Sequence, residues 1–215
     1  MIMDLVNLRK EITELVVKEM EEMGLLTQSV PVSISARHLH VTKEHLEILF
    51  GKNYELTIEK EISQPGQFAA KEKVDLKTSK GEIRGIRILG PVRNKTQIEL
   101  PKSDFRKIGL TGEVRNSGDV TGSEGITIIG PKGQVHLQEG LIIADRHIHM
   151  KPEDAKRYGV VSGQIVSVAV PGIKGGIMNH VTIRVSESYA LDFHVDTDDA
   201  NAFLLENGQM LQIIK

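Results

Sequence analysis

The chain has 215 residues, of which 40 % are hydrophobic and 26 % are charged, enough for one large domain or two small ones. A formal charge of −2 and an aromatic content of 4 % argue against nucleic acid as a partner, because phosphate backbones need a basic surface and bases need rings to stack on. The absence of cysteine excludes disulfides and thiolate ligands, so a transition metal would need His, Asp and Glu.

The spacing of apolar residues in residues 1–24 predicts an amphipathic helix that ends at Gly24. Its apolar stripe consists of Leu5, Leu8, Ile12, Leu15, Val16, Met20 and Met23. We expect residues 1–27 to pack on their own domain or in a dimer, with docking to a larger assembly as the alternative. Early charged residues argue against a signal peptide, and no apolar run reaches the roughly 18 residues that span a bilayer. A cytoplasmic protein without a membrane partner is therefore expected.

The motif Arg-His-x-His at residues 37–40 opens the first β-rich half. The run that follows has helical spacing and ends at Gly51, so it predicts one short helix. Alternating polar and apolar residues then predict strands at 54–62, 73–88 and 96–100.

The same motif recurs at residues 146–149. Pro152 stands where a first helical turn tolerates proline, and Gly159 ends this second short helix. Strands are predicted at 164–170, 180–185 and 190–196. The repeat indicates two equivalent halves, residues 28–115 and 116–215, and exchange of strands between them is left open.

The repeat also places a third metal-capable side chain at the same point in each half. Glu99 aligns with His194, and each precedes a helix N-cap signal, at Ser103–Asp104 and Thr197–Asp198. Histidines at i and i+2 of a strand point to one face, so each pair can share one cation with the third residue. The predicted ligand sets are His38, His40 and Glu99 in the first half, and His147, His149 and His194 in the second. Three protein ligands leave a coordination position open.

Several features have competing interpretations. A single His-x-His also occurs as a hydrogen-bonded strand end, and the first copy resembles a cupin motif, although Val32 stands where that motif has glycine. The glycine-rich run at 115–125 lacks the Gly-Lys-Ser/Thr ending of a phosphate-binding loop and predicts a turn that joins the halves. Arg93 is either a ligand for a phosphate or carboxylate or part of a surface salt bridge. The remaining histidines, His45, His136 and His180, are interpreted as surface or hydrogen-bonded positions.

The segments RHLH, GPVR followed by QIEL, RHIHM and DFHVD, spread over about residues 30–215, together resemble the phosphate propanoyltransferases, which are phosphotransacylases of propanediol-utilisation bacterial microcompartments. The resemblance implies a mainly β fold with short helices, built from two pseudo-repeated β-barrel domains. It implies two zinc ions per chain, one on each ligand set, and a catalytic, phosphate-binding role for Arg93. The implied reaction moves a propanoyl or acetyl group between coenzyme A and inorganic phosphate.

The same resemblance bears on partners and location. It implies acyl-CoA and phosphate as substrates, and we expect a homo-oligomer. Residues 1–24 would serve as an encapsulation peptide that binds shell proteins and directs the enzyme into a microcompartment. Two alternatives stay open: a metallohydrolase of a thioester or phosphate ester, and a cupin-like or shell-associated barrel without enzymatic activity.

Overall fold

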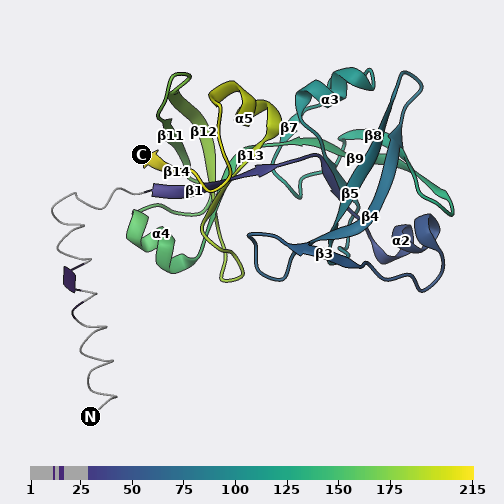
Figure 1. Ribbon diagram of the computed structural model, residues 1–215, viewed down its shortest axis with the longest axis horizontal. Coiled ribbons are helices and arrows are strands. Elements are labelled where there is room, and N and C mark those ends of the chain that lie inside the picture. Colours follow the sequence, from purple (N-terminus) through teal and green to yellow (C-terminus); the bar gives the residue numbers. More distant parts are fainter. Residues whose placement is uncertain (1–11, 13–14, 17–28) are drawn as a thin grey trace, which may run out of the picture.

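The computed structural model describes residue 12, residues 15 and 16, and residues 29–215 (Figure 1). Within residues 29–215 the chain forms fourteen strands and four short helices. The predicted N-terminal helix lies outside the described residues, except for Ile12, Leu15 and Val16, which are helical. In the described part of the chain, no helix is both long and apolar enough to cross a bilayer.

Six strands form the first barrel. In ring order they are β4 (Phe68–Lys77), β5 (Glu82–Gly90), β2 (His38–His40), β6 (Gln97–Glu99), β9 (Gln134–Ala144) and β8 (Glu124–Ile129). The ring closes because β8 pairs with both β9 and β4. Two further strands, β3 (Ile58–Glu61) and β7 (Val114–Arg115), pair with β4 and β9. Helices α2 (Lys43–Phe50) and α3 (Lys102–Lys107) follow β2 and β6.

Six other strands form the second closed barrel. In ring order they are β1 (Ser29–Ser35), β13 (Asp192–Asp196), β10 (His147–Met150), β12 (Gly176–Val185), β11 (Ile165–Val170) and β14 (Met210–Ile214). Helices α4 (Pro152–Tyr158) and α5 (Thr197–Phe203) follow β10 and β13. The prediction of a mainly β chain with two barrels and short helices is confirmed.

The two barrels have equivalent strand pairings. The strand with the histidine pair is antiparallel to the strand that follows with the third predicted ligand, β2 with β6 and β10 with β13. It is parallel to β5 in the first barrel and to β12 in the second. The same strand order around both rings supports the duplication that the sequence indicates.

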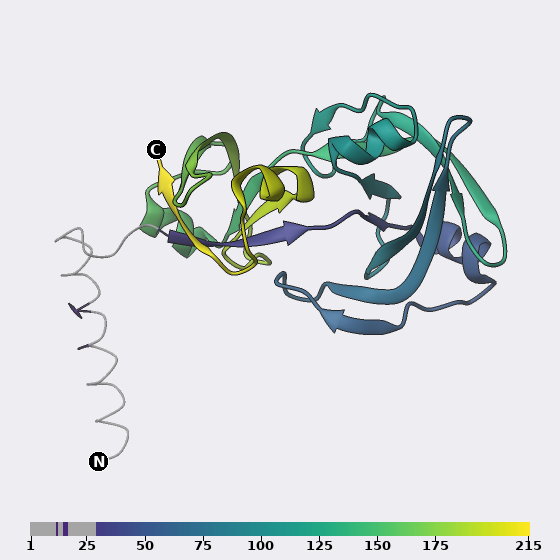
Figure 2. The ribbon, with the colours of Figure 1, turned by 45° about the horizontal axis from the view of Figure 1, so that its top comes forward.

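Two strands are exchanged between the barrels. β1 pairs with β13 and β14 of the second barrel, yet the chain continues from β1 into β2 of the first barrel (Figure 2). Reciprocally, β9 pairs with β6 and β8 of the first barrel and leads into β10 of the second. The sequence boundary between residues 115 and 116 therefore cuts across the first barrel, because β8 and β9 follow it in the chain but complete that ring.

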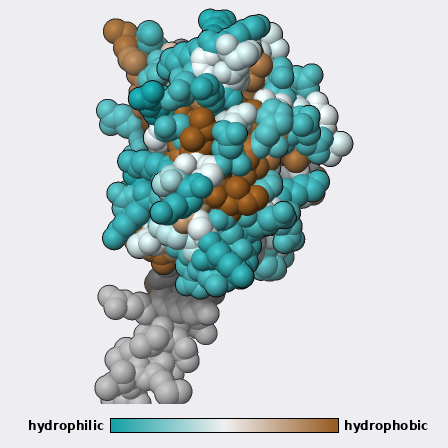
Figure 3. All heavy atoms as spheres, turned by 90° about the vertical axis from the view of Figure 1, so that its right-hand side faces the viewer, coloured by the Kyte–Doolittle hydropathy of each residue, from teal (hydrophilic) through white to brown (hydrophobic). Residues whose placement is uncertain are grey.

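Each barrel has its own hydrophobic core. On β11, Val166, Val168 and Val170 are buried, and the residues between them face outward. The first core includes Leu39, Ile88, Ile98, Phe105 and Leu141, and the second includes Ile148, Val168, Ile183, Phe193 and Leu211. The outer face of the first barrel is mainly hydrophilic, with hydrophobic side chains gathered near its centre (Figure 3).

The short helices begin and end at specific residues. In α2, the Thr42 side chain accepts from the amide of His45, and the helix ends at Gly51 as predicted. In α4, Pro152 is the first residue, and Gly159 ends the helix with a left-handed backbone, again as predicted.

The predicted caps of the other two helices were wrong by one or two residues. The N-cap of α3 is Pro101 and that of α5 is Asp196. Ser103, predicted as a cap, instead donates its amide to Asp198 of α5 at 2.7 Å. The two helices that follow the third predicted ligands therefore contact each other across the barrel junction, and both lie at the top of Figure 1.

Candidate metal centre

Both histidine pairs point away from the barrel cores. The residues between the histidines, Leu39 and Ile148, are fully buried and belong to the two hydrophobic cores. Because successive side chains on a strand alternate in direction, the flanking histidines face the other side. That side is the junction between the barrels, where all four histidines line one cavity of about 260 Å³.

Strand register brings the third predicted ligand to each pair. In the first barrel Glu99 is the Cα partner of His38, and in the second His194 is the Cα partner of His147. Directly opposite residues in an antiparallel pair have neighbouring side chains on one face. The same register in both barrels explains why Glu99 and His194 occupy equivalent places.

The first set is compact and its nitrogens are oriented. The ring Nδ1 of His38 donates to the carbonyl of Ala36 at 2.8 Å, and that of His40 donates to Leu89 at 3.1 Å, which leaves Nε2 of both rings with a free lone pair. Glu99 Oε2 lies 3.5 Å from His38 Nε2. Ligands at about 2.1 Å in a tetrahedron stand about 3.4 Å apart, so this spacing fits one bound zinc.

The second set repeats part of this arrangement. His147 Nδ1 donates to the carbonyl of Asp145 at 2.8 Å, as His38 does to Ala36. The ring of His194 lies 5.2 Å from that of His147 and 4.8 Å from that of His149. In each set, the candidate ligand atoms lie within 4.8 Å of one another.

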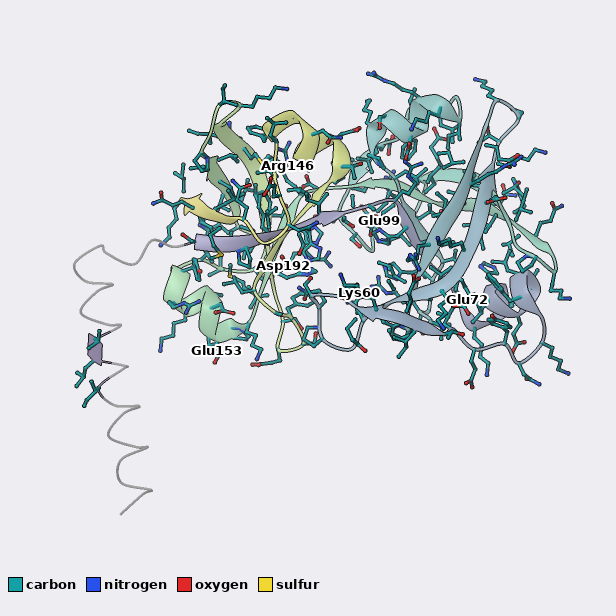
Figure 4. All side chains as sticks on the ribbon, in the orientation of Figure 1. Lys60, Glu72, Glu99, Arg146, Glu153 and Asp192 are labelled. Atoms are coloured by element: carbon teal, nitrogen blue, oxygen red, sulfur yellow. The ribbon has the colours of Figure 1, made fainter. Side chains whose placement is uncertain are left out.

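Unpartnered polar atoms make the second set a candidate cation site. Both ring nitrogens of His149 and Oδ2 of Asp192 are buried without a hydrogen bond among the described residues. Asp192 Oδ2 is 3.0 Å from His194 Nε2, but it lies off the line of a ring hydrogen bond. Buried nitrogens and carboxylate oxygens are ordinarily satisfied, so a divalent ion fits the donors present here. Glu99 and Asp192 lie at the barrel junction in Figure 4.

The protonation states suit metal binding. Burial is the main cause that lowers the pKa of His40 to about 3, of His147 to about 4 and of His149 to about 2, and neighbouring histidines lower each further. Burial alone would raise the pKa of Glu99, but interactions with His38 and His40 and the hydrogen bond from Ser117 lower it to about 2. At neutral pH these imidazoles are uncharged and the carboxylate is ionised, which are the forms that bind a metal.

Arg93 belongs to the same cavity. Its guanidinium donates to Gln67 Oε1 at 2.8 Å, and burial lowers its pKa while nearby Glu99 raises it. The competing interpretation as a surface salt bridge is not what the structure shows, since no carboxylate pairs with Arg93 in the described chain. A second guanidinium, Arg184, also lines the cavity, so two positive groups face the predicted ligands.

The arginine at the start of each motif has a partner that sequence reasoning missed. Arg37 Nε lies 3.2 Å from Asp104, and Arg146 Nε lies 3.6 Å from Asp199. Each aspartate is five residues beyond the third predicted ligand, on the helix that follows it, and Arg146 is seen beside α5 in Figure 4. The equal spacing of five residues in both halves was a signal that could have revealed these pairs.

Other residues of the site had no short-range sequence signal. Ser117 donates to Glu99 Oε1 at 2.7 Å, and the ring of Tyr189 stacks on His149 with centroids 4.0 Å apart. Of the other histidines, His45 bonds to Thr96 and His136 to Thr127, as expected for hydrogen-bonded positions. A cupin motif would also use Glu44 beside the first histidine pair, but Glu44 is exposed on α2 whereas His38 and His40 are buried, which argues against that interpretation.

Comparison with known proteins agrees with this geometry. Residues 31–206 match the family described as phosphate propanoyltransferase. The chain belongs to the phosphate propanoyltransferase family. A protein of that name from Thermotoga maritima is 47 % identical over 208 residues, which cover 95 % of this chain and 99 % of the relative. Another of the same name, from Lachnoclostridium phytofermentans, is 46 % identical over 206 residues, with coverage of 94 % and 96 %.

The predictions of this family and of an acyltransferase enzyme are thereby confirmed. As a phosphate propanoyltransferase family member, the chain carries all six predicted ligands and Arg93 within the matched residues. The matched residues span both β-barrels.

Proposed function

We propose that this chain is a zinc-dependent phosphotransacylase that moves a propanoyl or acetyl group between coenzyme A and inorganic phosphate. The observation that carries the proposal is that two three-ligand sets and Arg93 line one cavity between the barrels. The names of the relatives support the reaction type.

We propose that His38, His40 and Glu99 hold one zinc ion and that His147, His149 and His194 hold the other. Nitrogen and oxygen donors without thiolates suit zinc, and each set leaves a coordination position free for substrate. When bound, the ions would supply Lewis acidity that polarises the thioester carbonyl and stabilises the departing thiolate.

The chain's own residues would bind and orient phosphate. Arg93 presents a planar fork that matches a phosphate, and its hydrogen bond to Gln67 holds that fork in place. A phosphate oxygen would attack the thioester carbonyl carbon, so that a carbon–oxygen bond forms as the carbon–sulfur bond breaks and coenzyme A leaves as thiolate. No protein nucleophile is needed, and Ser117 serves instead to orient Glu99.

The walls of the cavity would favour transfer over hydrolysis. Ile62, Leu89 and Pro101 line it together with the polar residues, and the cavity lies between the two barrels. Apolar walls around a bound acyl group limit the access of water, which would otherwise compete with phosphate for the thioester. The product formed in the presence of phosphate distinguishes the proposal from a metallohydrolase.

The test combines metal analysis with a product assay on propanoyl- and acetyl-CoA. We expect the wild type to bind about two zinc ions per chain and to form acyl phosphate only when phosphate is present. His38→Ala and His147→Ala should each lose about one ion and at least about 100-fold of activity. His136→Ala, which alters an exposed residue of β9, is the matched control. Release of free acid instead of acyl phosphate would establish a hydrolase, and full activity of both variants would exclude the proposed centre.

We also propose that the enzyme is a cytoplasmic homo-oligomer and that residues 1–24 bind microcompartment shell proteins. The amphipathic pattern of that segment supports this role. Deletion of residues 1–24 should abolish co-purification with shell proteins while the zinc content stays unchanged. A deletion that alters only the oligomeric state would instead assign the segment to the interface between copies.

A further inference from the structure

A tight turn between β3 and β4 projects from the first barrel toward the second (Figure 2). The amide of Gln67 donates to the carbonyl of Gln64 at 3.2 Å, which closes a four-residue turn. Pro65 and Gly66 occupy its central positions, and Gly66 has a φ of +71°. A turn of this kind requires glycine at the third position, and proline stiffens the second. The side chains at both ends of the turn therefore start from a rigid backbone.

The Gln64 side chain, from the first barrel, makes two hydrogen bonds to one residue of the second barrel, Ala190. Its Nε2 donates to the carbonyl of Ala190, and its Oε1 accepts from the amide of Ala190, both at 3.2 Å. The side chain thus pairs with both backbone groups of Ala190, as a neighbouring strand would. Gln64 is only 2 % exposed, so no water competes for these bonds.

The segment that Gln64 holds lies directly against the second ligand set. Tyr189, the neighbour of Ala190, stacks on His149, whose ring nitrogens have no hydrogen bond among the described residues. Gln64 Nε2 is also 3.5 Å from His194 Nε2, at the outer limit of a hydrogen bond. The preceding residue, Ser63, is among the groups that lower the pKa of Asp192. Gln64 of the first barrel therefore contacts both the segment next to Tyr189 and the ring of His194.

We propose that Gln64 is a positioning residue that fixes the second ligand set relative to the first. His149 has no hydrogen bond of its own to set its ring orientation, unlike His38, His40 and His147, and so depends on the Tyr189 stack that Gln64 holds in place. The first set needs no such support, because its nitrogens are already oriented by its own barrel. This inference rests on the proposed metal-binding function of the two sets.

The proposal is specific because it predicts a loss at one set only. Partners that orient metal ligands typically change metal affinity about 10- to 100-fold when they are removed. A glutamine that only stabilised the fold would weaken both sets alike, through a lower population of folded protein. The two effects are separable when each set is measured alone.

The experiment uses the full-length chain and cobalt(II) as the probe. The His38→Ala variant keeps only the second set intact, so cobalt binding to this variant measures the second set. The His147→Ala variant keeps only the first set intact and measures the first set. Gln64→Ala should lower the cobalt affinity of the second set about 10-fold or more and change the cobalt affinity of the first set by no more than about twofold. Gln164→Ala is the matched control, because Gln164 also accepts from a backbone amide but lies outside the cavity. It should leave both affinities unchanged.

Amide hydrogen exchange of the metal-free protein gives a readout that does not depend on metal. Gln64→Ala should raise the exchange rate of residues 189–194 by about 10-fold, and Gln164→Ala should not. Gln64→Met, which keeps the side-chain volume but cannot bond to Ala190, provides a second variant if the alanine form does not fold. Unchanged exchange at residues 189–194, or equal weakening of both sets, would overturn the proposal. Absence of cobalt binding by both sets would overturn the proposed function instead, and exchange alone would then decide the role of Gln64.

Discussion

Arg93 is held in place by an uncharged partner. Its guanidinium donates to the amide oxygen of Gln67. The carboxylate of Glu99 is nearby, but its closest charged partner is His38 of the first ligand set. A buried guanidinium without a paired carboxylate keeps its attraction for an anion that enters the cavity. This residue therefore has the environment of a substrate-binding group.

Replacement of Arg93 should act on phosphate more than on coenzyme A. A hydrogen bond to a charged group contributes about 1.5 to 3 kcal/mol, so Arg93→Ala should raise the KM for phosphate about 10- to 100-fold. Arg93→Lys should recover only part of this, because an ammonium group cannot bond in the bidentate manner of a guanidinium. Steady-state kinetics with phosphate as the varied substrate provide the measurement. Arg157→Lys, on the exposed side of α4, is the control, and an unchanged KM in Arg93→Ala would refute the assignment.

The six predicted ligands could be found from the sequence because their signals lie within short segments of the chain. The i, i+2 spacing on a strand and the internal repeat both act within one segment, so they are visible in the chain. Gln64 and Ala190 contact each other across 126 residues of sequence, and nothing in either segment indicates the other. Asp192 and Tyr189 were missed for the same reason, since their roles depend on tertiary packing.

In each half, an arginine–aspartate pair joins the residue before the histidine strand to the helix that follows the third predicted ligand. The two pairs occupy equivalent places, but their surroundings differ. Asp104 is 1 % exposed and also accepts from Lys107 at 2.7 Å. Asp199 is about one-third exposed, and burial and neighbouring aspartates raise its pKa above the usual value. The negative charge of Asp104 is therefore stabilised by two cations, whereas the negative charge of Asp199 is repelled by neighbouring aspartates.

Neutralisation of the two aspartates should thus have unequal effects. Asp104→Asn should lower the free energy of unfolding by about 1–3 kcal/mol, because two cations lose a buried partner. Asp199→Asn should change it by less than about 0.5 kcal/mol, since the lost ion pair is partly exposed and repulsion is relieved. Urea unfolding of both variants measures the difference. A larger loss in Asp199→Asn than in Asp104→Asn would contradict this account.

At the scale of elements, the starts of the helices that carry these aspartates were predictable only approximately. Ser103 has the chemistry of an N-cap, but its amide bonds to Asp198 of the other barrel. Pro101 caps α3 without a side-chain hydrogen bond, which no local preference for capping residues would select. α5, by contrast, starts at a local cap, because the Asp196 side chain accepts from the amide of Asp199.

The exchange of β1 and β9 was beyond the reach of pattern reasoning. The first halves of both strands alternate buried with more exposed residues, and such alternation shows that a segment is a strand but not which neighbour it pairs with. The chain therefore passes between the barrels at two places. β1 of the second barrel leads into β2, which carries the first histidine pair, and β9 of the first barrel leads into β10, which carries the second. The cavity between them is consequently part of the folded unit as a whole.

The histidines at the junction link the stability of the whole molecule to pH. Burial lowers the pKa of His40 to about 3 and that of His147 to about 4, whereas in the unfolded chain each is near 6.5. Between these values the unfolded chain binds protons that the folded chain does not. Without metal, stability is therefore full above about pH 6.5 and declines as the pH falls toward the folded values.

We expect the metal-free protein to lose up to about 1.4 kcal/mol of unfolding free energy per pH unit for each such histidine below about pH 6.5. Urea unfolding in the presence of a chelator at about pH 7.5, 6.5 and 5 measures the slope. His147→Gln should make the slope shallower, because it removes one of the groups that titrates only in the unfolded chain. Added zinc should shift the decline to lower pH, since the metal binds only the deprotonated ligands and must be displaced by protons. A stability that stays constant between about pH 6.5 and 5 in the metal-free protein would show that these imidazoles are not buried in their neutral form.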